Sequence, residues 1–280
     1  MDYFQFIILV KMLVSIVMVV LLSVLAELVS PRFAGVLSGY PLGAAISLFF
    51  FGYELSPEFA ADSAVYTCVG LVATQAFAYL YYQVSIRAGR LDKPQNIMLA
   101  SSMSLCGYFL VAVTLRPLEP NLLLAVTLPA ASIVLFVALF KRVDNVRIRQ
   151  RVALNPQVLF MRSLAAAFFI VVITSTAKWV GPSWAGLFSA FPVTMLPLVV
   201  IIHVTYDPEH VYAILKNVPK GIGSLIVYSV AVHLLYPAYG IYLGTLLAYL
   251  LATLYLVLLH VKGGAPRLLS TLQSRTTRSS

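Results

Sequence analysis

Charged residues are scarce in this sequence. Only 10% of its 280 residues are charged, whereas 61% are hydrophobic. An ordinary soluble domain has about 25% charged and about 45–50% apolar residues. The scarcity of charge therefore excludes a soluble globular protein. It predicts an all-α, polytopic transmembrane helical bundle, because backbone exposed to lipid must form its hydrogen bonds within its own segment.

Cysteine and catalytic motifs are also nearly absent. Cys68 and Cys106 each lie in an apolar run, so neither a disulfide framework nor a metal site is predicted. There is no glycine-rich phosphate loop, no ordered Ser-His-Asp set and no pair of catalytic carboxylates. We therefore expect no enzyme and no cofactor. Asp2 replaces the basic start of a signal peptide, which favours a retained first helix.

The charge that is present is mainly basic, with a net value of +9, and it lies between the apolar runs. Cations cluster at residues 87–93, 141–151 and 262–278, whereas residues 54–62 carry acidic side chains. Basic loops flanking apolar segments are typical of the cytoplasmic side of a membrane protein, not of a nucleic-acid-binding surface. We expect a bacterial inner-membrane protein with its N-terminus outside and its C-terminus in the cytoplasm, surrounded by lipid and present as a monomer or homodimer.

The apolar runs predict about nine transmembrane helices, since about 20 apolar residues cross the hydrocarbon core. Residues 1–118 and 158–262 are interpreted as two four-helix repeats. Residues 119–157 would form a linker helix with a basic cytoplasmic loop, and residues 263–280 a disordered cytoplasmic tail. The expected spans are residues 4–28, 33–53, 63–86, 97–115, 122–140, 159–179, 184–204, 222–236 and 240–261.

An internal repeat supports this division. Residues 26–58 align without gaps to residues 177–209 at a constant offset of 151. The matching positions include proline, glycine, serine and glutamate, which chance similarity between apolar runs seldom produces: Pro31 with Pro182, Gly35 with Gly186, Ser38 with Ser189, Pro41 with Pro192 and Glu58 with Glu209. Four helices in each half and one linker helix predict halves of opposite orientation, an architecture found in many secondary transporters.

Each half resembles the small four-helix bacterial membrane proteins of the GlpM family. The second half carries the resemblance best, with Arg162, then Lys178 sixteen residues later, then Ala-Gly-Leu-x-x-x-Phe-Pro over residues 185–192. The first half keeps Lys11 but has Glu27 in place of the second cation. The resemblance implies a fused, inverted pair of units that can otherwise pair as separate chains. It implies no particular substrate, because the family has no assigned molecular activity.

The repeated motif has a structural and a functional interpretation. Small residues at spacings of three and four make a helix face suited to close packing. Pro41 and Pro192 interrupt a predicted helix and free the carbonyls of Leu37 and Phe188. Such interruptions bind ions or polar substrates in transporters, with nearby hydroxyls as ligands. The candidate substrate- or ion-binding residues are Ser38, Pro41, Ser189, Pro192, Thr194 and Gln75.

Four charged residues within the predicted spans are further candidates, because a charge inside a membrane is costly. They are Lys11, Glu27, Arg162 and Lys178. All lie within one or two turns of a predicted helix end, so extension of the side chain to the interface is the alternative. His233 is a polar residue that can line a cavity or form an ordinary hydrogen bond, and His203 lies near a helix end.

These features predict a secondary transporter or flippase of a small or lipid-linked, possibly anionic, substrate that works by alternating access. Two alternatives remain open: a passive ion channel, and a scaffold without transport activity for envelope biogenesis. An anionic substrate would be attracted by Lys11, Arg162 and Lys178.

Overall fold

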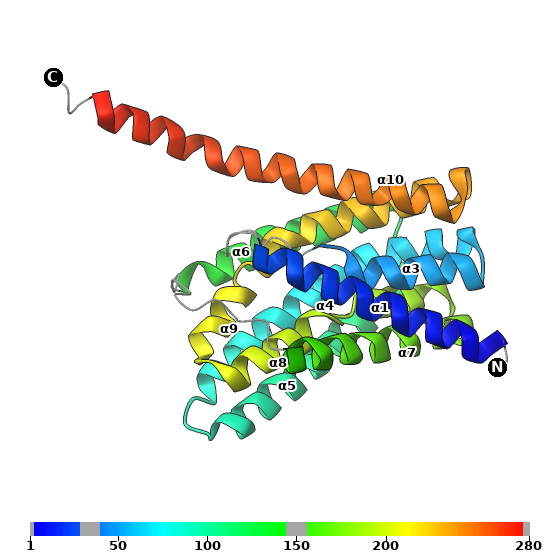
Figure 1. Ribbon diagram of the computed structural model, residues 1–280, viewed down its shortest axis with the longest axis horizontal. Helices are drawn as coiled ribbons and strands as arrows, with labels where there is room; N and C mark the ends of the chain where they lie inside the picture. Colours follow the sequence, from blue (N-terminus) through cyan, green and yellow to red (C-terminus); the bar gives the residue numbers. More distant parts are fainter. Residues whose placement is uncertain (1–2, 29–39, 144–155, 277–280) are drawn as a thin grey trace.

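The structure is a computed structural model that describes residues 3–28, 40–143 and 156–276. Within these ranges, the side chains of residues 3, 4, 22–28, 142, 158 and 260–276 are not described. The described chain is entirely helical (Figure 1). Its α-helices are α1 (Tyr3–Leu28), α3 (Leu42–Glu54), α4 (Pro57–Arg87), α5 (Lys93–Leu115), α6 (Leu122–Leu139), α7 (Pro156–Ser189), α8 (Met195–Thr205), α9 (Pro208–Leu215) and α10 (Val218–Thr276). The short 3-10 helices are η1 (Arg116–Leu118) and η2 (Phe140–Arg142).

Two of the long helices fold back on themselves at a glycine. Gly181 in α7 and Gly240 in α10 have positive φ angles of 76° and 74°, a conformation that glycine adopts without steric cost. The α10 hairpin is tight, because a Cβ atom added to Gly223 would lie 2.1 Å from the hydroxyl of Tyr255. Figure 1 shows α10 reversing direction at the end of the bundle where the N-terminus lies.

In the described part of the chain, five helices are long and apolar enough to cross a membrane: α4, α5 with η1, α6, α7 and α10. Three shorter apolar helices accompany them, in α1, α3 and α8. Large apolar side chains point outward from α5, α6 and α10, among them Leu110, Leu123 and Leu250. A surface of this kind needs lipid around it. The expected total of nine crossings stays a prediction.

Helix α4 lies at the centre of the bundle. It packs against α3, α5, α6, α7, α9 and α10. It begins where the sequence predicted a capped helix start, since Ser56 accepts a hydrogen bond from the Phe59 backbone N–H at 3.0 Å and Pro57 is the first helical residue. Asp207 and Pro208 occupy the equivalent places at the start of α9, although the Asp207 side chain forms no capping bond.

Helix α1 and the first limb of α7 run in opposite directions. In Figure 1, α1 runs from right to left, whereas the first limb of α7 (residues 156–180) runs from left to right. Helix ends also recur at the offset of the sequence repeat. α3 ends at Glu54 and α8 at Thr205, and α4 begins at Pro57 and α9 at Pro208, each pair 151 residues apart.

Three sequence expectations differ from the structure. The span expected over residues 184–204 is not one helix, because the chain leaves the helix after Ser189 and re-enters it at Met195. α9 is a separate short helix that the apolar pattern did not predict. The tail expected to be disordered over residues 263–280 continues α10 as far as Thr276. A helix that is already formed extends at low cost, because each further residue adds a backbone hydrogen bond.

Candidate functional site

The helix break after Ser189 is the centre of the candidate site. Residues 190–194 lie between α7 and α8, and Pro192 in this stretch has no N–H to donate. The sequence predicted a free carbonyl at Phe188, but the Phe191 N–H donates to that oxygen at 3.0 Å. The turn tightens at this point, so the predicted free carbonyl of Phe188 is satisfied locally. The equivalent Leu37 lies outside the described residues.

Carbonyls at and beside the end of α7 instead receive hydroxyls from neighbouring helices. The Thr67 hydroxyl of α4 is shared between the carbonyl oxygens of Ser63, at 2.9 Å, and Gly186, at 3.1 Å. Thr74 of α4 donates to the carbonyl oxygen of Ala190 at 2.5 Å. Tyr108 of α5 donates to that of Leu187 at 2.5 Å. Three side-chain donors therefore hold the second limb of α7 (residues 182–189) and the first residue of the break against α4 and α5.

These hydroxyl donors were missed in the sequence. A signal was present, because Thr67 and Thr74 are seven residues apart and so share one face of a helix. Their role depends on a segment more than 100 residues away. Periodicity within one helix carries no information about such a partner.

Glycine permits the close approach of α7 to α4. A Cβ atom on Gly186 would lie 2.1 Å from the carbonyl oxygen of Ser63, and one on Gly70 would lie 2.7 Å from the Cβ of Ala190. Ala185 is fully buried beside Gly186. For the described part of the repeated motif, the small residues therefore form the close-packing face that their spacing predicted.

The two proline-containing segments meet in the middle of the bundle. Pro41 precedes α3, and its carbonyl accepts a hydrogen bond from the Ala45 N–H at 3.0 Å. From the other half, the Ser189 hydroxyl donates to the carbonyl oxygen of Ala44 at 3.3 Å. A contact between residues 145 positions apart thus joins the two segments. Ser38, the counterpart of Ser189, lies outside the described residues.

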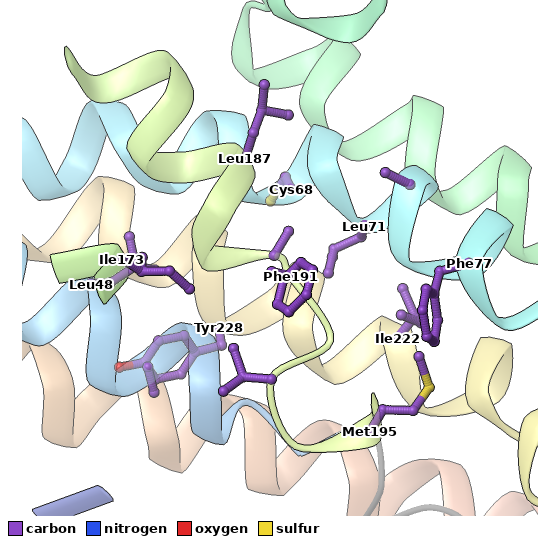
Figure 2. Packing of buried hydrophobic residues seen from close by; sticks show 14 of the residues in the cluster. Leu48, Cys68, Leu71, Phe77, Ile173, Leu187, Phe191, Met195, Ile222 and Tyr228 are labelled. Carbon is purple, nitrogen blue, oxygen red and sulfur yellow. The ribbon is translucent and has the colours of Figure 1, made fainter. Parts of the chain in front are cut away.

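A small cavity, called here the inner cavity, lies between these segments and has a volume of about 50 Å³. A space of this size holds only a few water molecules. Figure 2 shows the open chain running from Phe191 to Met195 beside Leu71 and Ile222. The inner cavity is lined by Tyr40, Gly43, Ala44, Leu71, Thr74, Ser189, Ala190, Phe191, Pro192, Val193, Thr194, Met195, Val218, Ile222 and Leu225.

A second cavity, called here the vestibule, opens at the other end of the second limb of α7. It has a volume of about 480 Å³ and is lined by residues of α4, the η1–α6 connection, α7 and α10. Asp62 and His233 are among its polar residues, and the His233 ring is held by a 3.0 Å hydrogen bond between Nδ1 and the carbonyl of Ala61. The limb of eight residues from 182 to 189, about 12 Å long, separates the vestibule from the inner cavity.

Lys11 has a carboxylate partner that the sequence analysis did not identify. Its Nζ lies 2.7 Å from Oε1 and 3.0 Å from Oε2 of Glu54, at the end of α3, and 5.6 Å from the centre of the Phe50 ring. The Lys11 side chain is 2% exposed and that of Glu54 is 26% exposed. The Lys11 side chain is therefore buried and forms an ion pair between α1 and α3 with a carboxylate that is partly exposed.

The other charged candidates have different surroundings. Lys178 is exposed, with its Nζ 5.1 Å from the centre of the Trp179 ring, as expected at a membrane interface. Arg162 is half-buried, and its Nε has no hydrogen-bond partner in the described part of the chain. Glu27 lies near the end of α1, and its side chain is outside the described part. Of the three cations, none lines the inner cavity.

Gln75 lies away from the proline-containing segments. Its Nε2 donates to the Ser132 hydroxyl of α6 at 2.6 Å, and its buried Oε1 has no partner in the described chain. His203 is buried, with its Nδ1 3.0 Å from the Tyr81 hydroxyl. Among the described residues, no group of three or more histidine, cysteine, aspartate or glutamate side chains is placed to hold a metal ion.

The structure thus brings Ser189, Pro192 and Thr194 together around the inner cavity, with Pro41 next in the chain to the lining residue Tyr40, and leaves Gln75 apart. The apolar surface, the spanning helices and this interrupted interior define a multi-pass helical membrane protein. No family model, curated protein or solved structure matches the chain. The resemblance to the GlpM family therefore stays a prediction based on the motif.

Proposed function

We propose that the protein is a secondary transporter or flippase that works by alternating access, with the two proline-containing segments as its substrate gate. The observation that carries this proposal is the hydrogen bond from Ser189 to the carbonyl of Ala44, which joins the two segments in the middle of the bundle. Irregular backbone at membrane depth is tolerated where it is buried in protein or lines a water-filled cavity. In transporters, such helix interruptions lie at the substrate path.

The two cavities support a gated path. The vestibule is the wider of the two, at about 480 Å³, whereas the inner cavity measures only about 50 Å³. The second limb of α7 lies between them and is held by hydroxyl groups of Thr67, Thr74 and Tyr108. In this proposal, movement of the limb joins the inner cavity to the vestibule and admits a substrate. The structure then corresponds to a closed state.

An inverted repeat is part of the same proposal. The recurrence of helix ends at an offset of 151 residues and the opposite directions of α1 and the first limb of α7 support it. Two halves related in this way supply two alternative conformations of similar energy, which alternating access requires. Reporter fusions after Glu54 and after Thr205 are expected to lie on opposite sides of the membrane. Fusions on the same side would contradict the inverted arrangement.

A disulfide between the two segments tests the gate. A Cβ on Gly43 would lie 3.4 Å from the Cβ of Val193, close to the separation of about 3.8 Å found in disulfides. We propose the pair Gly43→Cys and Val193→Cys with Cys68 and Cys106 replaced by serine. Oxidation is expected to abolish transport in proteoliposomes, and a reductant is expected to restore it. Each single cysteine variant is the matched control and should respond to neither treatment.

The substrates to test are fluorescent phosphatidylglycerol for lipid scrambling, and radiolabelled succinate and phosphate for uptake. Saturable movement of a probe that occurs only while the cysteine pair is reduced supports a transporter or flippase. Large, non-saturable current in a planar bilayer would support a channel instead. If neither flux nor current is found, and the oxidised pair behaves like the reduced one in cells, a scaffold is the better explanation.

Accessibility provides a test that needs no substrate. In the same background lacking native cysteines, Thr194→Cys lies at the inner cavity. Alternating access predicts that a membrane-impermeant maleimide modifies this cysteine from either side of the membrane, in right-side-out and in inside-out vesicles. Complete protection from both sides would contradict the proposed path.

A further inference from the structure

Within the described ranges, Arg162 is a cation without an ion-pair partner, at the edge of the bundle. It lies in the first limb of α7, between a buried face that includes Ser163 and Ala166 and an exposed apolar face that includes Phe160 and Met161. Its Nε is buried without a hydrogen-bond partner, and it forms no ion pair with a described carboxylate. A guanidinium group in an apolar environment is costly to leave unpaired.

The first half of the chain shows how the equivalent cation is neutralised. Lys11 stands 151 residues before Arg162, and Glu54 neutralises it within hydrogen-bonding distance. The residue 151 positions after Glu54 is Thr205, the last residue of α8. The second half has therefore kept the cation and lost the carboxylate. What is missing at Arg162 is one negatively charged, hydrogen-bond-accepting group.

We propose that Arg162 binds the anionic group of the substrate, a carboxylate or a phosphate, which takes the place of the missing glutamate. This inference rests on the proposed transport function and names the class of substrate. A guanidinium presents two parallel N–H donors to either group, so both chemistries fit. The position of Arg162 beside exposed Phe160 and Met161 is open to a lipid phosphate as well as to a soluble anion. The other candidate cations do not share this role, because Lys11 is already paired and Lys178 is exposed.

Binding is measured on the full-length protein in neutral detergent by thermal unfolding, followed through the fluorescence of its two tryptophans, Trp179 and Trp184. The probes are inorganic phosphate, succinate and dioleoyl phosphatidylglycerol, with phosphatidylcholine as the uncharged control and ionic strength held constant with chloride. At least one anionic probe is expected to raise the midpoint in a saturable way. Stabilisation by phosphatidylglycerol alone identifies a lipid headgroup, and stabilisation by phosphate or succinate identifies a soluble anion.

Variants then locate the bound anion. Arg162→Gln is expected to weaken apparent affinity by about tenfold or more, as loss of a charged hydrogen bond does. Arg162→Lys should retain weakened, saturable binding, and it serves as the test if the glutamine variant does not fold. Thr205→Glu should also weaken binding, because it restores an internal carboxylate while Arg162 stays in place. Lys178→Gln is the matched control and should bind as the wild type does.

The inference is overturned if no anion stabilises the wild type, or if Arg162→Gln binds every probe with unchanged affinity. It is also overturned if Glu27→Gln or Asp144→Asn destabilises the protein as much as Arg162→Gln without any added anion, since the counter-ion would then be internal. Failure of this inference and failure of the proposed transport function can be told apart. Transport that continues unchanged in Arg162→Gln contradicts this inference alone, whereas anion binding at Arg162 without any flux contradicts the transporter alone.

Discussion

The two proline-containing segments have the same sequence pattern but differ in what surrounds them. The first leads into α3, whose last residue, Glu54, neutralises Lys11 of α1. The second leads into α8, whose last residue is Thr205, and Arg162 forms no ion pair with a carboxylate in the described part of the chain. The second segment is instead held by hydroxyls of α4 and α5. The two segments thus share a sequence pattern, while residues outside the pattern determine the contacts that hold each of them.

This difference suggests a division of roles between the halves. The first segment is fixed to α1 by an ion pair, which is costly to separate in an apolar environment. The second is fixed by hydroxyl groups, whose hydrogen bonds contribute less inside a membrane. On this view the second limb of α7 moves and α3 stays. The following variants test the comparison, from the largest expected effect to the smallest.

Gly186→Ala is expected to have the largest effect. The added Cβ would lie 2.1 Å from the backbone carbonyl oxygen of Ser63, which cannot move without displacing α4. Overpacking of this kind is expected to lower the free energy of unfolding by about 3 kcal/mol. Gly43→Ala, at the first segment, is the matched control, because its Cβ would meet Val193 at an ordinary 3.4 Å. Thermal unfolding in detergent measures both, and equal midpoints would show that the two segments are packed alike.

Lys11→Met is expected to have the next largest effect, about 2 kcal/mol of destabilisation. The substitution leaves the carboxylate of Glu54 without its partner, and partial exposure of Glu54 reduces the cost below that of a fully buried pair. Adding Glu54→Gln should recover part of the loss, because the unpaired charge is then removed. A double-mutant cycle on the unfolding free energy measures the coupling. Strictly additive effects would show that the pair does not fix α1 to α3.

Tyr108→Phe is expected to have the smallest effect, about 0.6 kcal/mol, the average value of a hydrogen bond between transmembrane helices. The variant removes the donor to the carbonyl of Leu187 and keeps the ring. If the second limb of α7 moves, the variant should also increase labelling of Thr194→Cys, while Lys11→Met should not. An effect on stability larger than that of Lys11→Met would reverse the proposed roles of the two segments.

Features of the fold that depend on neighbouring residues in the chain were predicted from the sequence. The all-helical class, the capped start of α4 and the small-residue packing of Gly186 follow from composition, capping residues and spacing within single segments. The position of Pro192 also indicated where a helix is interrupted. Each of these features depends on residues close together in the chain.

Features that depend on partners distant in the chain were not predictable in the same way. Glu54 is 43 residues from Lys11, and Thr74 is 116 residues from Ala190. Glu54 was interpreted as a loop charge, because the second span was expected to end at residue 53. The free carbonyl assigned to Phe188 was wrong, since a tight turn at Phe191 satisfies it. The repeat and the orientation of its halves stay predictions.

In the proposed gate, the three hydroxyl groups that hold the second limb of α7 contribute to the free energy of its release. At about 0.6 kcal/mol each, their hydrogen bonds together contribute about 2 kcal/mol, which lowers the released population by a factor of about 30. The close packing of Gly186 against α4 lowers this population further. A ligand that binds only the released form would shift the equilibrium toward it.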